Sequence, residues 1–178
     1  MGKITRQVVD QATLSLDGVG NFDFVNKFCY LGDMIGAGGG AEEASRARVR
    51  SAWCKFRELA PILTKRGASL IVKGKLYSAC VRSVMVYGSE TWATRVEDMN
   101  RLLKAERMMV RSMCGVSLKD GKSSAELLSR LGIVSVVEIV EKGRLRWYGH
   151  VERKDAEDWV SKCRGLEVLG GRGEGRLK

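Results

Sequence analysis

A glycine-rich turn in the first quarter of the chain has the G-x-G-x-x-A spacing of dinucleotide-binding loops, with Gly36, Gly38 and Ala41. In such loops the backbone approaches a pyrophosphate, and a second parallel strand ends in an acidic residue about 20 positions later. Here residues 57–69 continue a helical pattern that contains Pro61, and the carboxylates of Glu42 and Glu43 would repel a phosphate. We therefore interpret the turn as a flexible joint between a strand and a helix. A nucleotide-dependent enzyme stays as a less favoured hypothesis, which a strand just after Pro61 would support.

Groups that could carry acid–base or metal chemistry are few. The one histidine, His150, lies between Arg146 and Arg153, which favours phosphate contact or packing over proton transfer. The chain has no Asp-Asp pair, which a two-metal site for nucleotidyl transfer would use. Its five cysteines are far apart, unlike the close pairs of zinc sites, and indicate buried thiols in a reducing compartment. We expect no catalytic residue, metal, cofactor or small-molecule substrate.

Basic side chains recur at helical spacing on three segments with helical patterns. The rows are Arg46, Arg50 and Arg57; Lys104, Arg107 and Arg111; and Lys142, Arg146 and Arg153. A single row is often only a solvated helix face. Three rows in a chain of net charge +10 favour contact with nucleic-acid phosphates, which carries little sequence information. A helical interaction or structural protein without a nucleic-acid role is the alternative.

The elements that must position these residues follow from periodicity and turn signals. Residues 13–16 and 22–25 flank an Asp-Gly turn and predict a hairpin, and residues 28–35 predict a third strand. Helical spacing then predicts a first helix over 41–65 and a second that begins near Ser69. Further helices are predicted over 96–114, 124–131, 134–154 and 157–163. Trp53 and Phe56 should be buried, and Pro61 should kink or break the first helix near Ala60. The fold is therefore expected to be mostly α, with a small β element before a bundle of four to five helices.

Composition also bears on localisation. No apolar run approaches the roughly 18 residues of a membrane span, and the first residues do not match a secretory signal. We expect an intracellular protein, nuclear or cytoplasmic, without a membrane partner. Residues 165–178 are glycine-rich and basic, and we expect this tail to be disordered.

Five segments in order carry a resemblance to a known family. They read FCYLGDMI, AWCKFRELAPIL, KLYSACVRSVMVYGSETWA, LLKAERMMVRSMCGV and GRLRWYGHVERK. From Leu14 to Arg164 the chain resembles the segment downstream of the palm in reverse transcriptases of LINE-type (non-LTR) retroelements. The resemblance implies a palm remnant at 1–36, a thumb-like helical bundle at 41–115 and downstream basic helices at 123–164.

The same resemblance implies roles for individual residues. Tyr30, Leu31 and Gly32 would lie on the primer-grip side, and the row Arg46, Arg50 and Arg57 would face the phosphates of an RNA or DNA duplex. Packing roles are implied for Tyr87, Gly88, Glu90 and Trp92. The later motif contains Arg144, Arg146, Trp147 and His150. The resemblance assigns this motif no role, and we expect Arg144, Arg146 and His150 to contact nucleic acid because the helix is basic.

The departures from the family pattern limit the expected activity. The Tyr-x-Asp-Asp motif that binds magnesium in this family lies upstream of YLG and is absent here, as are the fingers and most of the palm. The chain is therefore expected to be a truncated copy that lacks polymerase activity on its own. At most it should keep binding to nucleic-acid duplexes without sequence preference.

Overall fold

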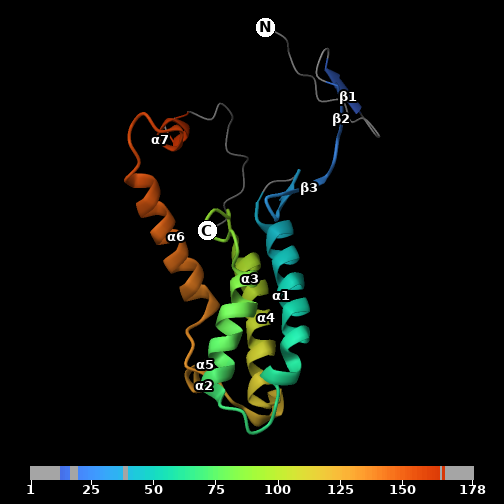
Figure 1. Ribbon diagram of the computed structural model, residues 1–178, viewed down its shortest axis with the longest axis vertical. Helices are drawn as coiled ribbons and strands as arrows, with labels where there is room; N and C mark the ends of the chain where they lie inside the picture. The colour runs from blue at the N-terminus through green and yellow to red at the C-terminus, as the bar shows by residue number, and fades with distance from the viewer. Residues whose placement is uncertain (1–12, 17–19, 38–39, 165, 167–178) are drawn as a thin grey trace.

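The computed structural model describes residues 13–16, 20–37, 40–164 and 166. They form two β-hairpins followed by a helical bundle (Figure 1). The strands are β1 (Thr13–Leu16), β2 (Gly20–Asp23), β3 (Lys27–Tyr30) and β4 (Asp33–Gly36). The helical segments are α1 (Glu42–Leu63), α2 (Leu70–Leu76), the π-helical η1 (Tyr77–Arg82), α3 (Ser83–Met85), α4 (Val96–Cys114), the 3-10 turn η2 (Leu118–Asp120), α5 (Ser124–Leu131), α6 (Val136–Glu152) and α7 (Trp159–Arg164). The predicted mostly α fold with a small N-terminal β element is confirmed. The tail at 165–178, predicted to be disordered, lies outside the described residues except for Leu166.

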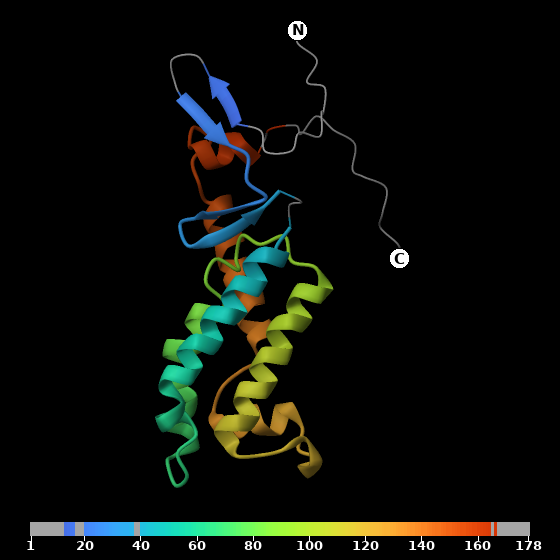
Figure 2. The same cartoon turned by 90° about the vertical axis from the view of Figure 1, so that its right-hand side faces the viewer.

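The predicted third strand is wrong in one respect, because residues 27–36 form a hairpin of their own. Tyr30 pairs with Asp33 across a two-residue turn, and β3 and β4 run antiparallel. The turn residues Leu31 and Gly32 have φ angles of 48° and 77°. Two successive positive φ angles are what a tight type I′ hairpin turn requires. The YLG segment therefore presents a turn at the N-terminal end of α1, as Figure 2 shows.

Helix α1 packs against the other helices of the bundle through one face. Phe56 is buried there, whereas Trp53 is only half-buried and packs edge-on against Phe56 with ring centroids 5.6 Å apart. The break predicted near Ala60 does not occur, since the helix continues through Pro61 to Leu63. Pro61 lies in the last turn, and the helix ends two residues later at Leu63.

The segment from α2 through η1 to α3 is one continuous helix at the centre of the bundle. Tyr77, Val81 and Met85 on this helix are completely buried. Gly74 brings this helix against the end of α5: a Cβ atom at residue 74 would lie 2.0 Å from the carbonyl oxygen of Leu131. A glycine is therefore required at this contact.

A buried ion pair ties α6 to the bundle. Arg82 donates through Nη2 to Glu106 Oε1 at 2.7 Å, and Glu106 Oε2 accepts the Val136 N–H of the first turn of α6 at 2.8 Å. Both charged side chains are buried. Only the first half of α6 packs on the bundle, through Val136 and Val140. Its second half extends past the bundle toward α7 (Figure 1). No helix within the described residues is long and apolar enough to cross a membrane.

Candidate nucleic-acid interface

The turn at residues 87–92 holds the YLG hairpin against the bundle. The Tyr87 hydroxyl donates to the carbonyl of Leu31 at 3.3 Å, and Trp92 Nε1 donates to Asp33 Oδ2 at 3.0 Å. Trp92 is buried with 5% of its surface exposed. Gly88 has a φ of 75° and lies close to both Asp33 and Trp92, so the turn depends on a glycine there. Segments 56 and 59 residues apart in the chain thus form one unit.

Arg48 closes this unit, and sequence reasoning missed it. Its guanidinium donates to the carbonyl of Gly32 and lies 4.3 Å from the ring centroid of Tyr87 in a cation–π contact. The only sequence signal is that Arg48 lies two positions from both Arg46 and Arg50, which directs it to another face of the helix. The carbonyls of Leu31 and Gly32 are therefore both occupied, and the large apolar side chains exposed on this hairpin include Phe28, Tyr30, Leu31 and Ile35.

The row Arg46, Arg50 and Arg57 lies exposed along α1. Arg46 pairs with Glu42. Lys27 pairs with Glu43 at 2.8 Å, and this hydrogen bond, with the nearby arginines, holds the pKa of that carboxyl below its ordinary value. Among the residues described, no carboxylate lies within ion-pair distance of Arg50 or Arg57. Arg50 and Arg57 thus carry positive charge without an ion-pair partner among these residues.

The second predicted row, on α4, divides into two parts. Lys104 and Arg107 are exposed. Arg111 donates to the carbonyls of Ser117 and Lys122 at 3.0 and 2.8 Å, and so holds the loop between α4 and α5. Its guanidinium therefore already has a structural partner.

The later motif on α6 faces the turn at 87–90 across a groove. This groove, which we call the α6 groove, has a volume of about 750 Å³. Its lining includes Tyr87, Glu90, Arg146, Trp147, His150 and Arg153. Arg144 lies outside it and donates to the Thr94 hydroxyl at 2.8 Å. Two motifs that the sequence shows only as separate segments therefore meet at one surface.

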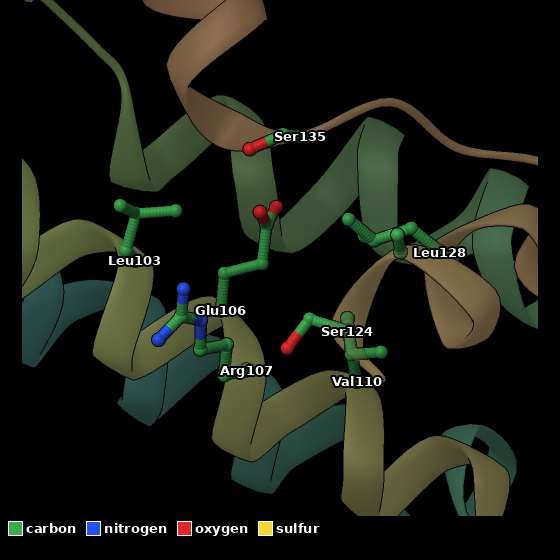
Figure 3. A pocket seen from close by; sticks show the side chains of 8 residues that line it. Leu103, Glu106, Arg107, Val110, Ser124, Leu128 and Ser135 are labelled. Carbon is green, nitrogen blue, oxygen red and sulfur yellow. The ribbon is translucent and has the colours of Figure 1, made fainter. Parts of the chain in front are cut away.

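A smaller cavity of about 210 Å³ lies between α4, α5 and the start of α6 (Figure 3). Its walls are mostly apolar, and Arg107 and Ser124 lie at it beside Glu106. The Glu106 carboxylate points toward the start of α6, where it already pairs with Arg82 and accepts the Val136 N–H. This cavity therefore has the character of a packing gap between helices.

The glycine-rich turn does not have the context of a dinucleotide site. Gly38 lies outside the described residues, but both described sheets are antiparallel hairpins, and α1 leads through a short turn into α2. A strand just after Pro61 would have supported the nucleotide-enzyme hypothesis; instead the helix continues to Leu63, and a turn leads to α2 at Leu70. In the described part of the chain, no three His, Cys, Asp or Glu side chains form a cluster that could hold a metal ion.

Comparison with known proteins gives one informative similarity. No family model matches the chain, and no solved structure matches it. An uncharacterized transposon-derived protein of Caenorhabditis elegans is 24% identical over 143 residues, which cover 78% of this chain and 51% of that protein. The chain thus spans about half the length of this curated relative. The similarity supports a transposable-element origin.

Proposed function

We propose that the chain is the non-catalytic C-terminal part of a LINE-type retroelement reverse transcriptase, and that it binds nucleic-acid duplexes through the phosphates. The ordered motifs and the transposon-derived relative support the origin. The observation that carries the binding role is the exposed row Arg46, Arg50 and Arg57 beside the YLG hairpin. A thumb-like bundle that grips a duplex needs an exposed cationic helix face of this kind, with the opposite face packed on other helices.

The row suits the geometry of a phosphate backbone. At 3.6 residues per turn its three members span about 40° of the α1 surface, so they lie along one line. Arginine can donate two parallel hydrogen bonds to phosphate oxygens. No base-reading motif accompanies the row, so the affinity should be similar for unrelated duplex sequences.

The test is binding of the full chain to two unrelated duplexes at several salt concentrations, followed by fluorescence anisotropy. Changing Arg46, Arg50 and Arg57 to glutamine should weaken binding to both duplexes. It should also flatten the plot of log affinity against log salt by about 0.9 for each lost contact to DNA. Glutamine is a good helix former, so circular dichroism should show an intact helix.

A control variant with the same charge change separates the row from net charge. It replaces the exposed residues Lys65, Lys119 and Arg130 by glutamine. This control should bind more tightly than the row variant and keep nearly the original salt slope. Equal behaviour of the two variants would show that the row is only a solvated face. Absence of duplex binding by the unchanged chain would favour the alternative, a helical interaction protein without a nucleic-acid role.

A further inference from the structure

The α6 groove has chemical features that the duplex proposal does not use. Its charged lining consists of Glu90 on one wall, Lys142 and Arg146 on α6, and Arg153 directly after the end of α6. Lys142 is paired with Glu138 at 2.5 Å. For Arg146 and Arg153, no carboxylate of the described chain lies within ion-pair distance. The groove is therefore cationic and suited to an anionic occupant.

Aromatic rings stand beside these cations. Trp147 is 42% exposed. The ring centroids of Trp147 and His150 are 5.6 Å apart, and the two ring planes are tilted by 30°. On the opposite wall Tyr87 is 54% exposed, and the Arg48 guanidinium lies over one face of its ring. A surface tryptophan has a large hydration cost, and no described residue covers this one fully. Both walls of the groove thus offer aromatic surface next to guanidinium groups.

We propose that the α6 groove binds single-stranded nucleic acid, with unpaired bases stacking on Trp147 and phosphates held by Arg146 and Arg153. Alternating aromatic and basic groups in a groove are the arrangement that sequence-tolerant single-strand binding uses. A duplex cannot use such rings, because its bases are already paired and stacked. An acidic peptide would satisfy the cations but would leave the aromatic rings without stacking partners. The site uses residues different from the α1 row, so either site can fail alone.

The test measures binding of the full chain to a labelled oligo-dT, which cannot form a duplex with itself. Trp147→Leu keeps an apolar side chain but removes the stacking face, and should weaken binding about 5- to 150-fold, the effect of one lost base stack. Arg146→Gln should reduce the salt slope by about 0.7 through one lost single-strand phosphate contact. Duplex affinity of the Trp147→Leu variant should stay close to that of the unchanged chain.

Trp159→Leu is the matched control, because Trp159 is 80% exposed on α7 and does not line the groove. This control and the glutamine variant of the α1 row should bind oligo-dT nearly as well as the unchanged chain. The proposal is overturned if the unchanged chain does not bind oligo-dT. It is also overturned if Trp147→Leu and Trp159→Leu have the same effect, or if a folded Arg146→Gln variant keeps the full affinity and salt slope. Binding of an acidic peptide that Trp147→Leu leaves intact would assign the groove to a protein partner instead.

Discussion

Replacing Gly74 by alanine should destabilise the protein, although alanine is the better helix former. The new Cβ atom would meet the Leu131 carbonyl oxygen at 2.0 Å and Ile133 Cγ2 at 3.1 Å. The first neighbour is a backbone atom in the last turn of α5, where the left-handed Gly132 ends the helix. It cannot move out of the way by a simple side-chain rotation. The two helices would have to separate by roughly 1.3 Å to restore an ordinary carbon–oxygen contact of about 3.3 Å.

Two opposing effects set the magnitude of this change. Overpacking of this kind costs about 1–3 kcal/mol, and a rigid backbone neighbour favours the upper part of that range. Alanine in a helix interior recovers at most about 1 kcal/mol relative to glycine. We therefore expect Gly74→Ala to lower the free energy of unfolding by about 1–2 kcal/mol, which lowers Tm by about 2–8 °C in a domain of this size.

Gly143→Ala provides a matched control within α6. A Cβ atom at residue 143 has no neighbour within 4 Å, so alanine should leave stability unchanged or raise it by up to about 1 kcal/mol. Urea unfolding followed by circular dichroism would measure both variants against the unchanged chain. If Gly74→Ala proves as stable as Gly143→Ala, the close packing of the central helix on α5 is wrong.

Three further outcomes are expected. Glu106→Ala should cost about 3–5 kcal/mol in urea unfolding, since it leaves Arg82 as an unpaired buried charge; a double change of both residues to methionine should recover much of this loss. For Asp98, burial alone would raise the pKa, but hydrogen bonds from the Arg95 N–H, the Ser45 hydroxyl and Arg101 lower it overall. Its stabilisation is therefore present above the unfolded pKa of about 3.9 and is lost as pH falls through the lower folded pKa. Asp98→Asn should thus lower Tm at pH 7 and converge with the unchanged chain in acid, and an equal Tm difference at both pH values would contradict this. With magnesium and a primed template the pure chain should synthesise no DNA; extension that is lost when one of its own carboxylates is changed would overturn that prediction.

The sequence predicted best the elements whose ends have local signals. The limits of α4 and α5 match the prediction, because acidic residues begin α4 and left-handed glycines, Gly115 and Gly132, end the two helices. The β3–β4 turn was missed because Leu31 adopts a positive φ, which leucine rarely does and which turn signals do not include. The π-helical segment η1 also has no local signal, and helical periodicity alone could not distinguish it from ordinary α-helix.

For the candidate site, periodicity predicted exposure but not partners. It placed Arg46, Arg50 and Arg57 together on one face, and the structure has all three exposed there. It gave the same weight to Arg111, whose guanidinium is bound to loop carbonyls. The positions of Arg48 and of the α6 groove depend on contacts between residues far apart in the chain. No alternation of residue types along one segment records such contacts.

The link from Glu106 to the first turn of α6 has a consequence for hydrogen exchange. It anchors the N-terminal half of α6 to the buried core, so opening there requires disruption of the main bundle. The second half has few buried apolar side chains to hold it, and Leu145 and Tyr148 are exposed. Protection of backbone amides should therefore fall along α6, from values near global stability around Val140 to much lower values around Gly149. The half that forms the groove wall would then open locally while the rest of the bundle remains folded.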